Sequence, residues 1–559
     1  MKKIYLSAIA IFASSVLSAQ TAFWTNTSYK GAFPITDNTP ATDWTNGWTN
    51  WDPENVNYGA TTTTISANIV TSTTLSGIVH LVNNVAVTNN STLTILPGTI
   101  IRGDKATKSC LIITRGAKIM AQGTAANPII FTSNESIANG RAPGDWGGLV
   151  ILGNGIINTA CATCTASATK ENYIEGFATT FPEILYGGNN NADNSGVLSY
   201  VRIEFSGVAL SATPNSELNG LTMGGVGSGT KLDHIQCSFI GDDSFEWFGG
   251  AVDAKWLISF RSLDDDFDTD FGHQGRVQFG LIVRDKDISD AAGDSNGFES
   301  DNFNPGIGRL PLTKTVFSNI TSIGPKRDGT VSLPVGEKFE RAMFTRRNTA
   351  ISIHNSLFTG WEKGWDLNGT TTADNYLSAT DSGAVQNAVI STDVLYSLIG
   401  QPLATMQAYA TIRNIDTTIT SAGIGFVSGF PTALETTPDY RLISASPVSS
   451  GASFTNTVFG GTFVGINNIT TFSDKIVSVY PNPASDVATL VIDAISTSVL
   501  NVSVYDLNGK LVASPVVDQT LQSGENTFTI NTSNLNNGVY FVTLSSNNGK
   551  ETVKLVVSK

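Results

Sequence analysis

The chain has 559 residues and a formal net charge of −14, with 47 acidic and 33 basic side chains. This balance argues against nucleic acid and anionic lipid as partners, because both reward basic patches. Only 14% of the residues are charged and 53 are glycine, while Thr, Ser and Asn accompany Val and Ile throughout. The mixture favours strands and tight turns over helices and predicts an all-β protein.

The first residues have the pattern of a cleaved secretory signal. Two lysines precede an apolar run over residues 4–17, and two small residues follow it. The run is too short to span a membrane, and no other apolar run in the sequence reaches spanning length. We expect a signal peptide at residues 1–19. Leu17 occupies a position where a small residue is preferred, which leaves the exact cleavage bond open.

Three tryptophans, Trp44, Trp48 and Trp51, fall within residues 20–60, ahead of a region of short repeats. If those repeats form a solenoid, its open end must be covered, because exposed rungs template aggregation. Large aromatic side chains suit such a cover, and we therefore predict an N-terminal cap at residues 20–60. The alternative is a platform on which sugar rings stack, since flat apolar ring faces suit pyranose faces.

Two internal repeats follow. The segment 91–101 returns as 109–119 at an offset of 18, with apolar residues alternating before a glycine corner. A second pair, residues 233–246 and 255–268, aligns at an offset of 22, about one coil of a β-helix. Alternating apolar side chains at a fixed short period predict strands of a solenoid that bury one side chain in two.

The sequences LTILPGT, GAKIMAQGT and PIIFT, which follow one another between residues 93 and 132, resemble the coils of right-handed parallel β-helix proteins of the pectin-lyase-like kind. Residues 439–447 resemble the segment with which such helices close. The resemblance implies a right-handed parallel β-helix passenger over residues 61–455, followed by a linker at 456–473. Within it, residues 361–431 are less regular, and we expect a long loop with a short helix around residues 395–410.

Four cysteines occur in the sequence: Cys110, Cys161, Cys164 and Cys237. Export makes disulfides permissible, and Cys161 with Cys164 could close a small loop while Cys110 and Cys237 form the remaining pair. The connectivity does not follow from sequence. A zinc knuckle would need a second ligand pair at suitable spacing, and no histidine lies near the small loop in sequence, so we favour a structural disulfide.

Acidic residues stack on one another if the 22-residue offset is a single coil. Carboxylates of one coil then lie under those of the next, about 4.8 Å away, where like charges repel. Oxygen ligands at this density suit a hard cation such as Ca²⁺. The residues that this register brings together are Asp242, Asp243, Glu246, Asp264, Asp265, Asp268 and Asp270.

Three interpretations of this cluster compete. The carboxylates are turn residues that bond their own corners, or they hold a structural Ca²⁺ between neighbouring coils, or they hold a catalytic Ca²⁺. The last applies to polysaccharide lyases of this fold, where a Lys or Arg removes a proton beside a uronate carboxylate. Lys255, Arg261 and Arg276 are near enough in sequence to be that base, but none belongs to a lyase motif. We favour structural calcium, followed by turn residues. Catalytic calcium comes last, because a fold does not define a function.

Other candidate residues are less specific. His273 lies in a glycine-flanked corner without any nucleophile pattern, so we interpret it as a turn residue. Exposed aromatic residues in line along one face would indicate a glycan-binding surface. The tryptophans that would form such a line are Trp247, Trp256, Trp361 and Trp365.

Residues 474–559 carry four motifs in order: YPNPxxD, a YDxxGK hairpin, a GxY strand and a basic C-terminus. Together they resemble the type A sorting domain of the type IX secretion pathway, which implies the type IX secretion machinery as a partner. Alternating strands at close intervals predict a small β-sandwich. The residues that carry the implied sorting signal are Tyr480, Pro481, Asn482, Pro483, Asp486, Gly509, Lys510, Gly538, Tyr540, Lys554 and Lys559.

The sequence as a whole predicts an all-β exported protein: a right-handed parallel β-helix passenger and a small C-terminal β-sandwich sorting domain. We expect it to be secreted or attached to the outer-membrane surface after crossing the periplasm, with no membrane span. The favoured function is non-catalytic and Ca²⁺-stabilised, with binding of a polysaccharide ligand or adhesion as its role. The alternative is a calcium-dependent polysaccharide lyase or another glycan-degrading enzyme.

Overall fold

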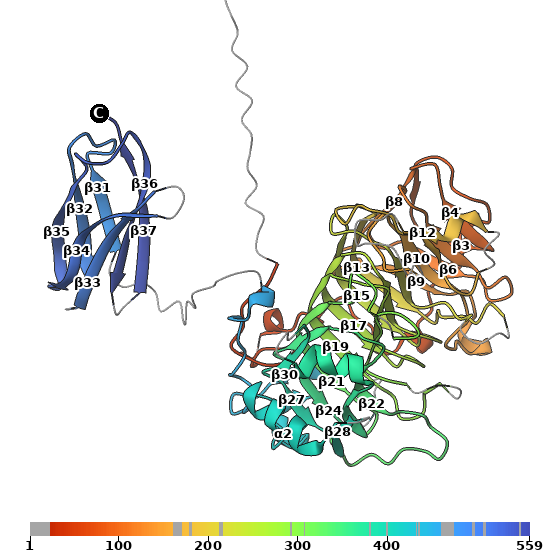
Figure 1. Ribbon diagram of the computed structural model, residues 1–559. Helices are drawn as coiled ribbons and strands as arrows, with labels where there is room; N and C mark the ends of the chain where they lie inside the picture. Colours follow the sequence, from red (N-terminus) through yellow and green to blue (C-terminus); the bar gives the residue numbers. More distant parts are fainter. Residues whose placement is uncertain are drawn as a thin grey trace, which may run out of the picture. The chain divides into compact units, whose positions relative to one another are not determined.

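A computed structural model describes residues 23–459 and 475–559, apart from short gaps (38, 160–169, 178–180, 212–215, 291–292, 294, 307, 379–381, 399–400, 432, 434–436, 495–497, 507–509 and 547–548). The chain divides into two compact units between Phe459 and Gly460 (Figure 1). The predicted signal peptide lies outside the described residues. Among those described, no helix has the length and apolar character needed to cross a membrane.

The N-terminal unit is built from two long parallel sheets in which the chain advances coil by coil (Figure 1). The first sheet has 16 strands: β1 (Thr63–Ile65), β2 (Thr73–Leu75), β3 (Ile78–Leu81), β5 (Thr92–Ile95), β6 (Ile100–Gly103), β8 (Lys118–Gln122), β9 (Ile129–Ser133), β13 (Gly196–Glu204), β15 (Lys231–Ser238), β17 (Asp253–Phe260), β19 (Arg276–Val283), β21 (Val316–Ile323), β23 (Ser352–His354), β24 (Leu357–Thr359), β26 (Ala384–Gln386) and β27 (Val389–Ser391). The second has 10: β4 (Asn84–Val87), β7 (Cys110–Ile113), β10 (Gly148–Leu152), β14 (Leu221–Gly224), β16 (Phe245–Phe248), β18 (Phe267–Asp270), β20 (Phe298–Ser300), β22 (Arg341–Thr345), β25 (Lys363–Leu367) and β28 (Val394–Leu398). This is a parallel β-helix.

The strand register tests the two predicted repeats. The 22-residue offset is one coil, because Phe245 of β16 pairs with Phe267 of β18. The 18-residue offset is not a coil: Leu93 pairs with Ile119 in the first sheet, whereas Leu111 lies in the second sheet. Every strand of a coil alternates apolar residues before a corner, so strands from different faces of the coil resemble one another in sequence. The coil in this region is 26 residues long, as the pairing of Leu93 with Ile119 shows.

The interior of the β-helix is filled by the alternate residues of each strand. Phe245, Trp247, Phe267 and Phe298 lie in this single apolar core, each 0% exposed. Trp361 and Trp365 are also fully buried, which leaves Trp256 as the one partly exposed member of the four tryptophans proposed to line a glycan surface. Those buried tryptophans stabilise the core, where complete burial of a large aromatic side chain contributes about 2–3 kcal/mol.

The longer strands of the first sheet bend at a residue with positive φ. This position holds Tyr200, His234, Trp256 and Phe279 in four successive coils, and their rings stack at centroid distances of 4.2, 4.5 and 5.9 Å. In the following coils asparagine takes the same place, which suits it because asparagine tolerates left-handed backbone. The asparagines are Asn319, Asn355 and Asn387.

Two helices pack onto the last coil. Tyr376 of α1 (Thr370–Leu377) and Tyr409 of α2 (Leu403–Ile412) contact Trp365 of the core at ring distances of 5.3 and 5.6 Å. The sequence indicated a helix at residues 395–410, but its first part is strand β28, and α1 was not predicted. The sequence of α1, TTTADNYL, has few large apolar residues, so it shows no clear helical period.

The segment predicted as an N-terminal cap has a different role. Residues 23–58, here called the strap, lie along the outer side of the β-helix, and the backbone of Gly31 bonds Asn355 while that of Asn50 bonds Gln236. Trp48 and Trp51 are 1% and 6% exposed. Trp48 packs on Tyr200 and His234, and Trp51 packs on Phe260, all on the outer face of the first sheet, so neither an end cap nor a sugar platform describes them. An outer sheet face rich in apolar residues needs such a cover as much as an open end does.

Shorter elements complete this unit. The antiparallel pair β29 (Phe426–Ser428) and β30 (Asp439–Leu442) packs with the strap through Tyr440. The predicted closing segment thus lies beside the β-helix and adds no rung to the parallel sheets. The remaining elements are η1 (Pro40–Thr42), η2 (Pro53–Asn55), η3 (Ile137–Asn139), β11 (Asn172–Tyr173), η4 (Pro182–Ile184), β12 (Leu185–Tyr186), η5 (Ala422–Ile424) and η6 (Thr457–Phe459).

The C-terminal unit is a sandwich of two antiparallel sheets with its own apolar core. One sheet contains β31 (Lys475–Tyr480), β32 (Val487–Ala494) and β35 (Gly524–Asn531). The other contains β33 (Ser498–Tyr505), β34 (Leu511–Leu521), β36 (Gly538–Ser546) and β37 (Gly549–Val557). The predicted β-sandwich is confirmed.

Candidate metal centre

The acidic side chains lie on the outer face of the second sheet and on the turns that lead into it. In β16 and β18, Phe245 and Phe267 enter the core, so that Glu246 and Asp268 must point outward. The register extends this row to Thr222 on one side and Glu299 on the other. Three carboxylates therefore occupy equivalent positions on three successive coils, where unscreened like charges repel.

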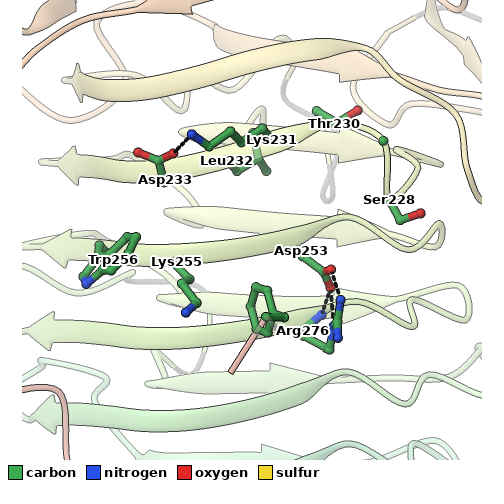
Figure 2. A pocket seen from close by; sticks show the side chains of 11 residues that line it. Ser228, Thr230, Lys231, Leu232, Asp233, Asp253, Lys255, Trp256 and Arg276 are labelled. Carbon is green, nitrogen blue, oxygen red and sulfur yellow. Dashed lines mark hydrogen bonds and ion pairs between the residues drawn. The ribbon is translucent and has the colours of Figure 1, made fainter. Parts of the chain in front are cut away.

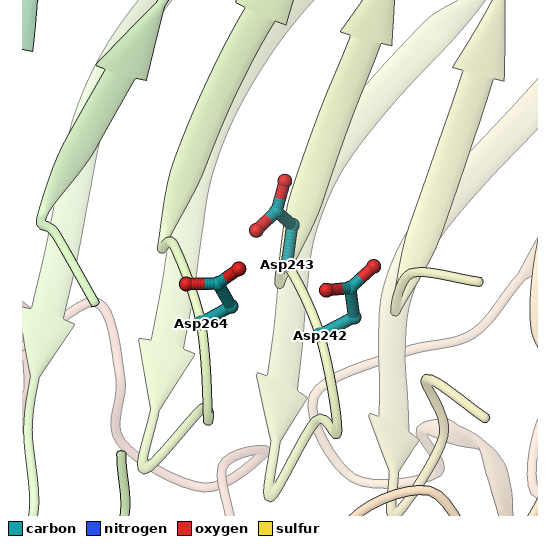
Figure 3. A group of neighbouring side chains, drawn as sticks. All are labelled: Asp242, Asp243 and Asp264. Atoms are coloured by element: carbon teal, nitrogen blue, oxygen red, sulfur yellow. The ribbon is translucent and has the colours of Figure 1, made fainter. Parts of the chain in front are cut away.

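Three overlapping groups of carboxylate oxygens have the spacing of a metal site, with all members of a group within 4.8 Å of one another. Figure 3 shows the first, in which Asp242 and Asp243 come from one turn and Asp264 from the next. The other two groups are Asp243, Glu246 and Asp268, and Asp265, Asp268 and Glu299. Six of the seven predicted ligands occur in these groups. Asp270 does not, and its carboxylate accepts the backbone N–H of Phe271 at 2.6 Å.

Burial and mutual repulsion raise the pKa values of these carboxyl groups. Loss of solvation is the main cause, followed by neighbouring carboxylates, for each of the six residues Asp242, Asp243, Glu246, Asp265, Asp268 and Asp270. Burial also raises the pKa of Glu299 to about 7, against the opposing effect of Arg346. A site that disfavours its own ionised form is one that a bound cation would stabilise.

Hydrogen bonds satisfy only part of the cluster. The Asp243 carboxylate accepts the N–H of Asp265 at 2.9 Å, the Asp265 carboxylate accepts the N–H of Asn296 at 2.6 Å, and Asn219 donates to Glu246. Two buried oxygens in the outward row, Thr222 Oγ1 and Asp268 Oδ1, have no hydrogen-bond partner. A buried, unpaired oxygen is costly, and these two lie beside carboxylate groups whose spacing could hold a metal ion.

Arginine side chains form ion pairs with carboxylates at the Glu299 end of the cluster. Arg346 pairs with Glu299 and with Asp301, and Arg347 pairs with Asp301 at 2.5 Å. Within the described part of the chain, no lysine or arginine forms an ion pair with Asp242, Asp243, Glu246, Asp265 or Asp268. These five carboxylates therefore have no compensating ion pair among the described residues, and oxygen-only ligands suit Ca²⁺.

Several residues of this site were not among the predicted ligands. Glu299 lies 31 residues after Asp268, so the longer connection hides it from a search at an offset of 22. Glu175 comes from a loop that covers the outer face, where burial raises its pKa to about 7 close to Glu246 and Asn219. Asn219 precedes β14 by two residues. A residue contributed by a covering loop leaves no periodic signal in the sequence.

The three candidate bases are not part of this centre. Lys255 and Arg276 line a groove on the first sheet, and Arg261 pairs with Asp285 at 2.5 Å. Burial lowers the pKa of the nearby Arg346, but the carboxylates of Glu299 and Asp301 raise it by more. Arg346 therefore stays protonated. None of these side chains is placed to take a proton beside the oxygen groups.

His273 is a buried structural residue. Its side chain is 0% exposed, Nδ1 lies 2.8 Å from Thr315 Oγ1, and its ring stacks on Trp247 at 5.8 Å. Burial lowers the pKa of His273 to about 3, so it is neutral at physiological pH. We predicted a turn residue at this position, and the structure shows a side chain packed against Trp247 of the core.

The proposed pair of Cys110 and Cys237 is wrong, because both are buried free thiols. They belong to different apolar clusters, on the outer face of the second sheet and in the interior. Cys161 and Cys164 lie outside the described residues. Burial raises the pKa of both described thiols, which suppresses the reactive thiolate.

We expect Cys110 and Cys237 to resist iodoacetamide in the native protein and to become alkylated on unfolding without prior reduction. Peptide mass spectrometry would locate the label at each position. Labelling that requires dithiothreitol after unfolding would show that these cysteines are oxidised and would contradict the free-thiol assignment.

A groove of about 700 Å³ lies on the outer face of the first sheet, across β15, β17 and β19 (Figure 2). Its volume is typical of small-molecule sites. The charged and aromatic residues that line it are Phe23, Lys231, Asp233, Asp253, Lys255, Trp256 and Arg276. Leu232 and Ala254, which alternate with them, are core residues, so the groove is separated from the acidic cluster by the interior of the β-helix.

The sorting motifs occupy ordered positions in the sandwich. The Asn482 side chain donates to the Lys554 carbonyl and accepts the Val556 N–H, both at 2.8 Å, and thereby fastens the first motif to the last strand. Tyr540 donates to the Asn536 carbonyl at 2.9 Å, and Lys559 Nζ to Ser533 at 2.5 Å. The other signal residues described are Tyr480, Pro481, Pro483, Asp486, Lys510, Gly538 and Lys554, whereas Gly509 lies outside the described residues.

Fold and site define a parallel β-helix protein with an acidic outer face and a separate C-terminal β-sandwich. Comparison with models of protein families matches residues 64–427 to the pectate-lyase-like β-helix domain and residues 478–558 to the secretion system C-terminal sorting domain. The chain belongs to the pectate-lyase-like β-helix family. Its sorting domain implies the type IX secretion machinery and a secreted or cell-surface protein. No curated protein matches the chain.

Proposed function

We propose that the protein is a non-catalytic, Ca²⁺-stabilised β-helix that binds glycan at the cell surface or in the medium, after a signal peptide has directed it through the periplasm. The observation that carries the calcium part is the outward row of carboxylates on successive coils. In that row Asp268 Oδ1 is buried without a partner while the neighbouring carboxylates repel one another.

Calcium fits this donor set better than other common cations. The groups offer carboxylate oxygens only, and three oxygens within 4.8 Å of one another in each group suit the irregular oxygen coordination of Ca²⁺, whose other positions water would fill. Mg²⁺ demands a stricter octahedron and keeps its waters, and Zn²⁺ prefers nitrogen and sulfur. A cation bound between coils would attract the carboxylates of both coils, which otherwise repel one another. Its role would be to hold the coils together.

A binding role is favoured over catalysis by where the basic residues lie. A lyase needs a base beside the cation, whereas Lys255 and Arg276 face a groove on the other sheet and Arg346 is doubly paired. The second sheet therefore supplies stability. The first sheet presents the groove, which is the feature of the described surface suited to a saccharide.

We expect Ca²⁺ to raise the thermal stability of the purified protein relative to EDTA. Binding to the native state contributes about 2.7 kcal/mol at a hundredfold excess over Kd, which for a unit of this size corresponds to about 3 °C in Tm. The substitution Asp268→Asn, which removes a ligand shared by two of the three oxygen groups, should greatly reduce this shift. It should also stabilise the protein in EDTA, because it removes one of the repelling charges while keeping the side chain's volume.

Asp328→Asn is the matched control. Asp328 also accepts hydrogen bonds at a turn, from Thr330, but it lies in an exposed loop, so its substitution should leave the calcium shift intact. Differential scanning calorimetry of the wild type and the two variants measures the Tm in EDTA and the shift in Tm on addition of Ca²⁺. An equal calcium response in wild type and Asp268→Asn would refute the site, and absence of any response would refute calcium binding.

A further inference from the structure

The two ends of the β-helix differ in how they are covered. At the C-terminal end, α1 and α2 pack onto the last coil. At the N-terminal end the first sheet begins with β1 and β2, and among the described residues each of these strands pairs on one side only, β1 with β3 and β2 with β5. The N-terminal coil thus presents a strand edge, which is a template for pairing with another chain.

This edge lacks the residues with which proteins usually protect a free strand. Charged side chains and prolines are the common protection. Residues 60–77, which contain both edge strands, have neither, and the whole segment 55–101 contains no Asp, Glu, Lys or Arg. In a protein with a net charge of −14, two such edges would meet without placing like charges opposite each other.

Alternate residues of the edge direct their backbone groups to the free side. The Ile65 carbonyl accepts the Val82 N–H, and the Leu75 carbonyl likewise accepts an N–H from the next coil, so these two residues bond toward the sheet. The direction of the backbone groups alternates along a strand, which leaves the N–H and C=O of Thr64 and Thr74 on the free side. Both threonines are exposed.

The edge is also stepped. Strands β2 and β3 follow one another in the same coil and belong to two halves of the sheet, which merge in β13, the common neighbour of β8 and β9. Because β1 lies one coil below β3, it projects one strand further than β2. A second copy turned by a two-fold axis perpendicular to the sheet would place its projecting β1 beside β2 and its β2 beside β1. Strands related in this way run antiparallel.

We propose that two copies of this chain associate through this edge as a two-fold dimer, in which β1 of each copy pairs antiparallel with β2 of the other. Thr64 then lies opposite Thr74 of the second copy, and the two residues exchange both backbone hydrogen bonds, as hydrogen-bonded pairs of an antiparallel ladder do. Their side chains share the outward face, where cross-strand threonine pairs are favourable. Ile65 and Leu75, which alternate with them, stay on the interior face.

The dimer closes because each copy uses its single N-terminal edge, while its other end carries helices. A two-fold contact of this kind forms a pair, whereas a contact between unlike surfaces would propagate into a filament. The association involves neither the acidic cluster nor the groove, so it does not depend on calcium or on a glycan.

Sedimentation velocity of the full exported chain over a range of concentrations measures the association and should reach a mass of two chains. Thr64→Pro should raise the dissociation constant of the dimer by about tenfold or more, because the two-fold interface loses two N–H donors. The Thr64 N–H faces the free side, so proline there removes no hydrogen bond from the chain's own sheet. Thr64→Val, which keeps the backbone donor, is the matched control and should associate like the wild type.

Cysteine pairs test the register of the proposed contact. Residues in a hydrogen-bonded antiparallel pair have Cα atoms about 5.5 Å apart, a distance that a disulfide can bridge. In one copy Thr64 and Thr74 lie in different halves of the sheet, so a disulfide between these positions requires two copies. Oxidation of an equimolar mixture of Thr64→Cys and Thr74→Cys should therefore give a covalent dimer on a non-reducing gel. Each variant alone, and the oxidised wild type, should give much less.

Three results would overturn the proposal. The first is a wild type that stays monomeric at every concentration and a cysteine mixture that does not cross-link. The second is association that continues beyond two chains, which would indicate a filament. The third is cross-linking of Thr64→Cys alone as strong as that of the mixture, which would indicate another register. If Thr64→Pro does not fold, the cysteine mixture decides between these outcomes.

Discussion

Without divalent cations, the stability of the β-helix should fall as pH rises from about 5 to 8. Urea unfolding in EDTA at a series of pH values measures this directly. The expectation follows from the carboxyl groups of the acidic cluster, whose pKa values burial raises above those of free side chains. Each pKa unit of difference between folded and unfolded protein corresponds to about 1.4 kcal/mol.

The sign follows from proton binding. An unfolded chain loses carboxyl protons near pH 4, whereas Glu175 and Glu299 in the folded protein have pKa values of about 7. Between these values the folded state holds more protons than the unfolded state, so stability decreases with rising pH. The contribution is complete below pH 4 and is lost as pH passes through about 7.

Calcium should reverse this trend, because its ligands must be deprotonated and its affinity therefore increases with pH. The gain in unfolding free energy on adding Ca²⁺ should be larger at pH 8 than at pH 5. Asp268→Asn should flatten the EDTA profile, and Asp328→Asn, in its exposed loop, should not. A profile in EDTA that rises between pH 5 and 8 would show that the cluster is not destabilised by its own charge.

The acidic cluster shows how far sequence alone could go. The 22-residue offset correctly placed Glu246 beside Asp268, because it is the length of the coil that separates them, measured in either sheet. The next coil is longer, so the partner Glu299 fell outside the pattern. Glu175 approaches from a loop whose course depends on tertiary packing. Sequence periodicity thus predicts contacts between successive coils where the coil length repeats, and it fails where the loops between strands differ in length.

The strap illustrates a second limit. The tryptophans of the N-terminal segment correctly indicated an apolar cover, but sequence did not show which surface they cover. Trp51 packs on Phe260, an outward-facing residue of β17, which a period-two pattern would assign to solvent. Both faces of the strand are buried there, so its apolar and polar residues no longer alternate. The sequence pattern therefore does not distinguish the inner face of the strand from the outer one.

The largest loss of stability from a single substitution is expected at Arg284, which lies behind the acidic cluster. Its side chain and that of Asp266 are both 0% exposed and form an ion pair at 2.8 Å. Arg284 also donates to the backbone carbonyls of Ser262, Asp264 and Asn296, and thereby fixes the turns that carry the candidate ligands. Removal of one partner from a buried pair costs about 3–5 kcal/mol.

Arg284→Met should therefore destabilise the protein by about 3–5 kcal/mol in urea unfolding, because Asp266 is left buried and uncompensated. The double substitution Arg284→Met with Asp266→Leu should recover part of this loss, since it removes the stranded charge. Calcium binding should remain weakened in the double variant, because the carbonyls of Asp264 and Asn296 have lost their common donor. A double variant with full calcium affinity would mean that the turns keep their geometry without Arg284, and a single variant of unchanged stability would mean that the pair is not buried.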